Sequence, residues 1–438
     1  MDTQTLRESS MDLIKKATSK AQDLMRDHGA SQQQQPIQNH QRQQTTGRLT
    51  PGPASEPVKV DQFTTQVRVY GQQQSNLPHI FRDGGGGGTV GGKHLIIFAD
   101  GTYTQGEPPT HPSRIVSFVS NSVAVAGDVD DPFSGDATAA GTTAEAGSSP
   151  TLAQVADTGT LDHGPVQAVP FLTDQGESAM DTAIWPNHNI ATLPGTDGTV
   201  GVGYSEVIDR NLFRQQKFAL LYNTPLEICI RSGQPVVSRP SKSLFLVGEP
   251  MFGSFCVVYP ELMPDGGDGY LYLFGRVSEA ANPQSNGLKL ARVRPPGFAD
   301  RSQFEFWDGR RFGTQMPELN DGGAASVFHY SQEAFGKHYG PGSGDIWWSA
   351  AHGAYVMLFQ NGAAAVDNSV YLSHSRSLVG GWSTPVCVYK IPHYEDGYSY
   401  CFHAYPNMDP ARRTVPISWT QDSKSRSCTI HTGEVLFS

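Results

Sequence analysis

The sequence lacks any apolar run long enough to cross a membrane. Its first 25 residues also lack the apolar core of a secretory signal peptide. We therefore expect no membrane span and, for the chain as encoded, a cytoplasmic protein. If the start of the coding sequence is assigned too far downstream and a signal peptide is lost, the protein would be secreted instead.

Charge and cysteine are also scarce. Only 17% of the 438 residues are charged, the formal net charge is −10, and the basic residues form no stripe, which argues against nucleic acid as a partner. The five cysteines are an odd number at spacings that match no zinc or redox motif, so we expect free thiols in the core. A disulfide between two of Cys387, Cys401 and Cys428 is the alternative.

Glycine and proline, in contrast, are abundant, with 47 and 30 residues, which suits many tight turns between short strands. Five runs end near a Gly or Asp and alternate, or nearly alternate, large apolar residues with small or polar ones, as half-buried strands do. They are HLIIFADGT, TVGVGYSEV, GYLYLFGRV, AYVMLFQNG and RTVPISWTQ, centred near residues 98, 203, 272, 357 and 417. Further strand-like runs follow several of them. The pattern predicts an all-β, five-bladed β-propeller over residues 77–438, with a β-sandwich as the structural alternative.

Two segments fall outside this pattern. Residues 1–76 read as a mostly disordered tail rich in Gln and Pro, with one amphipathic helix conceivable from Leu6 to Leu24. Residues 127–164 are rich in Gly, Ala, Ser and Thr and read as a flexible insertion loop inside the domain.

The innermost strands of a propeller converge on its axis, so polar residues from distant parts of the sequence can meet there. Hydrolysis of a glycosidic bond needs two carboxyl groups, about 5 to 5.5 Å apart for retention of configuration or about 6.5 to 9.5 Å for inversion. Asp83 precedes a run of five glycines, and Asp100 is expected to end the strand LIIFAD. Each aspartate alone could equally be a turn residue, but as a pair they are the best candidates for this chemistry.

In the same region RDGG, a glycine-rich gap, GK and an apolar run ending in F-x-D resemble the first blade of the propeller family known as domain of unknown function 4185. The resemblance continues through GEPMFGSFCVVYPEL, DIWWSAAHGAYVMLF and HAYPNMDPARRTVPISWTQ, and covers roughly the last 360 residues. That family is fungal and bacterial, has a fold related to glycoside hydrolase family 43, and includes endo-D-arabinanases. The resemblance implies that Asp83 and Asp100 are the catalytic carboxylates and that an arabinan-type or similar carbohydrate polymer is the substrate. FADGT departs from the family pattern, which has Gly before the Asp and Thr directly after it.

A third carboxylate would be expected to tune the pair. Glu249, in a family-like motif, ranks slightly above Glu206. Sugar rings are held by aromatic faces and by hydrogen-bonding groups, for which the candidates are Arg82, Trp185, Trp347, Trp348, His403 and Tyr405. For each of these residues, packing or solvent exposure is the competing explanation.

We expect no cofactor and no catalytic metal, because His329, His352 and His374 have no spacing that supports a shared site. Two other functions stay open. One is a carbohydrate-binding or scaffold propeller without catalysis. The other is a sialidase-like enzyme or lyase, which would need several arginines to converge; the available ones are Arg210, Arg214, Arg231, Arg276, Arg292 and Arg294. The sequence carries no signal for the oligomeric state.

Overall fold

The structure is a computed structural model that describes residues 52–106, 115–128, 150–186, 188–215, 220–277, 287–319, 321, 323–329, 340–361, 367–392, 397–408, 414–423 and 428–438. The helix expected near the N-terminus and the glutamine-rich segment after it lie outside these residues. Within the described ranges, no helix has both the length and the apolar character needed to span a membrane.

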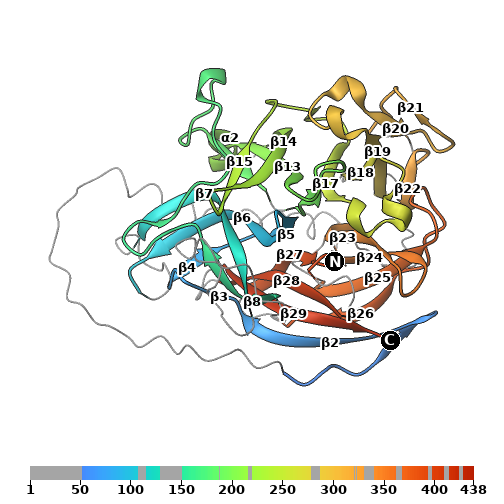
Figure 1. Cartoon of the computed structure of the whole chain (residues 1–438), viewed down its shortest axis with the longest axis horizontal. Helices are drawn as coiled ribbons and strands as arrows, with labels where there is room; N and C mark the ends of the chain where they lie inside the picture. The colour runs from blue at the N-terminus through green and yellow to red at the C-terminus, as the bar shows by residue number, and fades with distance from the viewer. Residues whose placement is uncertain are drawn as a thin grey trace.

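Five mainly antiparallel sheets stand as blades around a common centre (Figure 1). Blade 1 contains β4 (Ile80–Arg82), β5 (Gly86–Val90), β6 (Lys93–Thr104), β7 (Ile115–Asp128), β8 (Pro150–Asp157) and β3 (Gln74–Ser75). Blade 2 contains β11 (Thr182–Trp185), β12 (Ala191–Thr192), β13 (Val200–Asp209), β14 (Leu220–Arg231), β15 (Gln234–Ser238) and β16 (Phe245–Leu246). Blade 3 contains β17 (Met251–Val257), β18 (Leu271–Val277), β19 (Gly287–Val293), β20 (Glu305–Trp307), β21 (Phe312–Gly313) and β22 (Ser326–His329).

Blade 4 contains β23 (Pro341–Ser349), β24 (Ala354–Asn361), β25 (Ser369–Ser375) and β26 (Val386–Lys390). Blade 5 contains β27 (Gly397–Ala404), β28 (Thr414–Ser423), β29 (Thr429–Phe437), β2 (Phe63–Gln72) and β1 (Val58–Val60). The small hairpin of β9 (Gly159–Thr160) and β10 (Gly164–Pro165) lies beside β6 and β7. This arrangement confirms the predicted five-bladed β-propeller.

The five strand-like runs seen in the sequence are β6, β13, β18, β24 and β28, which are the second strands of the five blades, counted from the centre. A second strand is covered on both faces by the neighbouring blades, so its residues are buried whichever way they point. All eight residues of β24, for example, are buried. This double cover explains why these strands carried the clearest apolar signal.

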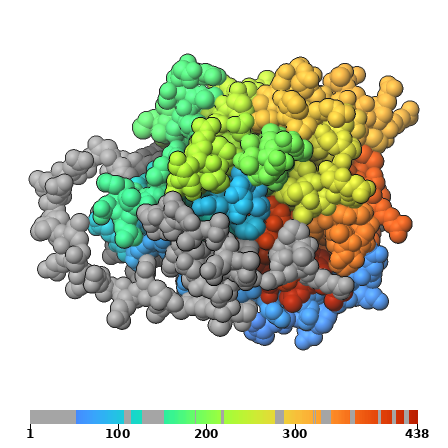
Figure 2. All heavy atoms as spheres, in the orientation of Figure 1, coloured from blue at the N-terminus to red at the C-terminus, as the bar shows by residue number. Residues whose placement is uncertain are grey.

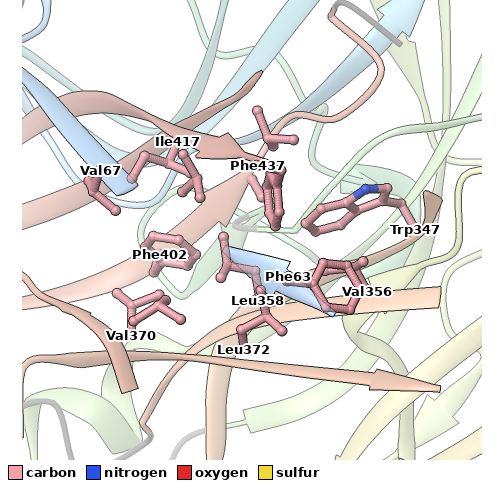
Figure 3. Packing of buried hydrophobic residues seen from close by; sticks show 14 of the residues in the cluster. Phe63, Val67, Trp347, Val356, Leu358, Val370, Leu372, Phe402, Ile417 and Phe437 are labelled. Atoms are coloured by element: carbon pink, nitrogen blue, oxygen red, sulfur yellow. The ribbon is translucent and has the colours of Figure 1, made fainter. Parts of the chain in front are cut away.

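Each interface between neighbouring blades has its own hydrophobic cluster, and the five clusters complete a ring. Figure 3 shows the cluster between blades 4 and 5, where Leu358 and Leu372 of blade 4 pack against Phe402 and Ile417 of blade 5. A β-sandwich would have one core between two sheets instead of five cores around an axis. The arrangement therefore excludes the sandwich alternative.

The ring is closed by strands that the sequence analysis placed in the disordered tail. β2 pairs with β29, from Thr65 opposite Phe437 to Gln72 opposite His431, and β1 pairs with β2. In Figure 2 the blue spheres of these strands lie against the red and orange spheres of the C-terminal blades. The expected boundary at residue 77 is thus wrong, because the alternation of buried Phe63, Thr65 and Val67 marks a strand of the domain.

The boundaries of the expected insertion loop, residues 127–164, are also wrong. β7 extends to Asp128, and residues 150–157 form β8, which pairs with β7. β8 was missed because its sequence, PTLAQVAD, continues the small and polar composition of the segment before it. Residues 129–149 of the expected loop lie outside the described residues.

All five innermost strands are irregular within the described residues. β4 ends at Arg82 and β5 begins at Gly86, β11 ends at Trp185 and β12 begins at Ala191, and the registers of β17, β23 and β27 each shift at one point. The glycine run next to the first break allows very close packing between blades 1 and 2. A Cβ on Gly86 would lie 2.0 Å from the His188 carbonyl oxygen, and one on Gly88 would lie 1.8 Å from that of Ile190. Only glycine permits this approach.

Candidate active site

Asp83 and Asp100 are neighbours across the first interruption. Asp83 directly follows β4, and its N–H donates to the Asp100 carbonyl over 3.3 Å, while the Ala99 N–H donates to the Asp83 carbonyl over 2.9 Å. Asp100 does not end a strand, as the sequence suggested, because β6 continues to Thr104. Gly101 extends the strand, paired with Arg82 on one side and Val119 on the other, instead of forming a turn. The structure thus brings together the two carboxylates that the sequence singled out.

Asp83 faces blade 5. Its Oδ2 accepts a hydrogen bond of 2.8 Å from the Tyr400 hydroxyl, and the neighbouring Gly84 N–H donates to Thr420 Oγ1 over 3.1 Å. Its Oδ1 is buried and has no hydrogen-bond partner among the described residues. Burial and then the charge of Asp100 raise the pKa of Asp83 to about 8, with a smaller contribution from Asp422, although the Tyr400 hydrogen bond opposes the rise.

Asp100 faces blade 2. Burial raises its pKa to about 6, and the Arg210 guanidinium and the Trp185 indole oppose this rise. Asp100 Oδ1 and Trp185 Nε1 are buried, and neither has a well-formed hydrogen bond within the described part of the chain. The Trp185 indole N–H and the Asp100 carboxyl group therefore interact only loosely with each other at this junction.

Arg210 is held in place by its local structure. It begins the short helix α2 (Arg210–Arg214), whose first turn is capped by the Asp209 carboxylate, and its Nε donates to the Thr182 carbonyl over 2.8 Å. Because Thr182 lies opposite Asp209 at the edge of blade 2, these contacts bring the cation next to Asp100. The two aspartates therefore share one site but have different surroundings, with an added acidic group near Asp83 and a cation near Asp100.

Glu206 is a further carboxylate of blade 2, next to Trp185. It lies directly opposite Trp185 in blade 2, and its Oε1 is 3.1 Å from Nη2 of Arg276 in blade 3. Arg276 Nη1 also donates to the Gly342 carbonyl of blade 4 over 2.7 Å. One arginine thus links three blades.

Glu249, the higher-ranked candidate for the third carboxylate, has a different environment. It precedes β17 and forms two hydrogen bonds of 2.7 and 2.6 Å with Arg301, and it accepts a third from the Leu246 N–H. Partial burial would raise its pKa, but these hydrogen bonds outweigh burial and lower it. None of its contacts leads to the aspartate pair, so the ranking of Glu249 above Glu206 is not supported by the geometry.

Three of the expected sugar-binding residues lie inside the blades. Arg82 is buried, stacks over the Phe98 ring and pairs with Asp157 within blade 1. Trp347 belongs to the core between blades 4 and 5 (Figure 3). Trp348 packs edge-on against Tyr355. Their neighbours support packing and not ligand contact.

Tyr405 and His403 are buried and hydrogen-bonded to other blades. The Tyr405 hydroxyl donates to the Gly85 carbonyl over 2.5 Å, and His403 Nδ1 is 3.1 Å from the Asp345 carboxylate. Both side chains are almost fully buried, at 1% exposure each. Of the predicted binding residues, Trp185 acts on Asp100, and Glu206 lies opposite Trp185 in blade 2.

Sequence reasoning did not single out Tyr400, and it named Arg210 only as one of six arginines. The six do not converge as a sialidase-like site would require: Arg210 is near Asp100 and Arg276 holds Glu206, whereas Arg292 and Arg294 both stack on Tyr270 in blade 3. Tyr400 lies in an alternating aromatic run, GYSYCFHAYP, that gives no hint of its partner 317 residues away.

All five cysteines lie in the described part of the chain, and the structure shows no disulfide among them. The described residues contain no group of three or more His, Cys, Asp or Glu side chains that could hold a metal ion. Of the three histidines considered, His374 pairs with Asp61, and His352 stacks on Phe63 at the edge of blade 5.

No family model and no curated protein matches the sequence, so the resemblance to domain of unknown function 4185 stays a prediction. Solved structures do match. A candidate hydrolase from Bacteroides ovatus ATCC 8483 is 13% identical, with a TM-score of 0.50, over 84% of this chain and 90% of that one. An exo-β-1,3-galactanase from Phanerochaete chrysosporium is 11% identical, with a TM-score of 0.44, over 80% and 60%. A thermostable family-43 glycoside hydrolase is 10% identical, with a TM-score of 0.41, over 81% and 89%. The likeness to these structures is one of fold.

Proposed function

We propose that this protein is a glycoside hydrolase that cleaves a carbohydrate polymer, with Asp83 as the general acid and Asp100 as the ionised carboxylate. The observation that carries the proposal is the aspartate pair itself: two adjacent carboxyl groups whose surroundings move their pKa values apart, to about 8 and about 6. At neutral pH such a pair holds one proton, on the member farther from a cation. That distribution is the one glycoside hydrolysis requires.

The reaction would proceed as follows. Asp83 gives its proton to the glycosidic oxygen as the bond from that oxygen to the anomeric carbon breaks. In the inverting route Asp100 takes a proton from water, and the water oxygen bonds to the anomeric carbon. In the retaining route Asp100 bonds to that carbon first, and water then displaces it, losing its proton to Asp83. In both routes one water molecule is consumed and the pair keeps one proton. The retaining route returns that proton to Asp83, whereas the inverting route leaves it on Asp100, from which it passes through solvent back to Asp83 before the next turnover.

The nearby groups suit a sugar. The buried donor on Trp185 and the acceptor on Asp100 could bind hydroxyl groups, and the half-buried Trp185 ring could lie against a sugar face. Glu206, held by Arg276, is the third carboxylate available to the same ligand. The resemblance noted in the sequence makes an arabinan-type polymer the first substrate to test.

The test is release of reducing sugar from a panel of plant and microbial glycans. We expect the wild-type protein to cleave at least one of them, and Asp83→Asn and Asp100→Asn to lower the rate by at least about 100-fold while glycan binding is retained. Asp174→Asn, at an exposed aspartate of a 3-10 helix away from the pair, is the matched control and should keep full activity.

Proton NMR of the first product would then separate the retaining from the inverting route. Binding without cleavage by the wild-type protein, across the whole panel, would refute the hydrolase and favour a carbohydrate-binding propeller.

A further inference from the structure

Tyr400 makes a contact between blades that the proposed chemistry has not yet used. Its hydroxyl donates to Asp83 Oδ2 over 2.8 Å, from a strand of blade 5 to a carboxyl group of blade 1. Asp83 Oδ1 has no partner among the described residues. The two oxygens of this carboxyl group are therefore not equivalent.

The backbone around Tyr400 is arranged for this contact. In the pairing of β27 with β28 the register shifts between Tyr400 and His403, which inserts one extra residue. The next residue, Cys401, has a φ of 51°, a left-handed conformation that costs energy for a residue other than glycine. Strain of this kind persists only where the surrounding structure imposes it, and here it lies directly beside the Tyr400 side chain.

The Tyr400 side chain is also fixed. Its ring stacks on Tyr398 at 5.2 Å, and its hydroxyl oxygen is 3.5 Å from the Cys428 sulfur. The groups that face Asp83 are Asp100 from β6, Tyr398 and Tyr400 from β27, Asp422 from β28, and Cys428 just before β29. Within this set, Tyr400 is the side chain that donates a hydrogen bond to Asp83.

We infer that Tyr400 is a positioning residue for the proposed hydrolysis, which fixes Asp83 through Oδ2 and thereby leaves the acidic proton on Oδ1. The reason is that a carboxylic acid accepts hydrogen bonds mainly on its carbonyl oxygen, so the oxygen that accepts from Tyr400 is not the one that carries the proton. The proton delivered to the glycosidic oxygen then starts from Oδ1, and Tyr400 keeps its own proton throughout. This inference rests on the proposed function, but the state of the carboxyl group can be measured without it.

The test compares Tyr400→Phe with Tyr398→Phe, a matched control on the same strand that leaves the hydrogen bond to Asp83 in place. Aspartates labelled with ¹³C at the carboxyl carbon are titrated by NMR, and the Asp83 signal is assigned by its absence in Asp83→Asn. Because the Tyr400 hydrogen bond favours the ionised form, its loss should raise the pKa of Asp83 by about one to two units. Tyr398→Phe should change it by less than about half a unit.

Activity gives a second measurement. In Tyr400→Phe we expect kcat to fall by about 10- to 100-fold with KM within about threefold, and the alkaline limb of the pH profile to move to higher pH. A merely structural role would lower thermal stability and activity but would not move that limb. The inference is overturned if the Asp83 titration is the same in Tyr400→Phe and wild type. If instead the titration shifts but no glycan is cleaved, the inference about Asp83 stands and the proposed hydrolase fails.

Discussion

Replacing Asp83 by asparagine should stabilise the protein in alkaline solution, although it removes the proposed acid. Asp83 has a pKa of about 8 in the folded protein, against a reference value of 3.8. Between these values the folded protein holds a proton that the unfolded chain has released. The free energy of unfolding therefore falls as pH rises through this window and levels off above about pH 8. Asparagine never ionises, so the free energy of unfolding of the variant does not fall in this way.

The size of the expected gain in stability follows from the rise in the pKa of Asp83. A rise of about four units corresponds to at most about 6 kcal/mol, at about 1.4 kcal/mol per unit. The side chain keeps some contact with solvent, and its surroundings can relax once it is charged, so we expect about half of this or less, roughly 2–3 kcal/mol. Relative to wild type, Asp83→Asn should gain that amount between pH 4 and pH 9.

Urea unfolding of wild type and variant at four pH values across this range would measure the gain. Asp174→Asn serves as the control, because its aspartate is exposed. A gap between Asp83→Asn and wild type that stays constant from pH 4 to pH 9 would refute the reasoning, since it would mean that Asp83 ionises as easily in the folded protein as in the unfolded chain.

Three further expectations follow from the structure. If the hydrolase proposal holds, the plot of hydrolysis rate against pH should be bell-shaped with limbs near pH 6 and pH 8, because Asp100 must be ionised and Asp83 must be protonated. A rate that is constant from pH 5 to pH 9 would contradict the assignment of the pair. Phe63 is fully buried between blades 4 and 5, so Phe63→Ala should lower the free energy of unfolding by about 3–5 kcal/mol in urea melts. Thr64→Ala, on the same strand, should lower it by less than about 1 kcal/mol. Equal effects would mean that β2 is not part of the closing blade. Gly88→Ala should prevent folding or lower Tm sharply, because the new Cβ would meet the Ile190 carbonyl. Gly313→Ala has open space around the new Cβ and no left-handed φ, so this variant should fold normally by circular dichroism. A normally folded Gly88→Ala protein would contradict the close approach of blades 1 and 2.

The sequence predicted the blade count because the second strands are long, apolar and buried on both faces, as in β24. The innermost strands have a weaker strand-like pattern in the sequence. The register of β17 shifts next to Gly253, that of β23 shifts at Gly342, and β5 is mostly glycine, so these strands do not show a regular alternation of large and small side chains. The closing strands β1 and β2 were missed because they follow a glutamine-rich segment and pair with residues far along the chain, a partnership that no local pattern records.

The proximity of the candidate pair could be predicted, whereas its function stays a prediction. Asp83 and Asp100 are close together in the sequence and belong to one blade, so the first-blade pattern that they resemble pointed to both. Tyr400 and Arg210 could not, since each reaches its aspartate from another blade and only the folded ring brings them together. Arg82 and Trp347 are packed inside the protein, a use of arginine and tryptophan that the sequence does not separate from sugar binding.

The pairing of β2 with β29 has a consequence for how the protein is made. β2 is synthesised early, yet the strand that it hydrogen-bonds along its length is formed by residues 429–437. Until the ribosome has released those residues, β2 exposes an unsatisfied edge on a growing chain, a state prone to mispairing and to capture by chaperones. Blades 1 to 4 can form in order as they emerge, but the ring cannot close before translation reaches its last strand. Tyr400 meets Asp83 across the junction of blades 5 and 1, so assembly of this site belongs to the final step of folding.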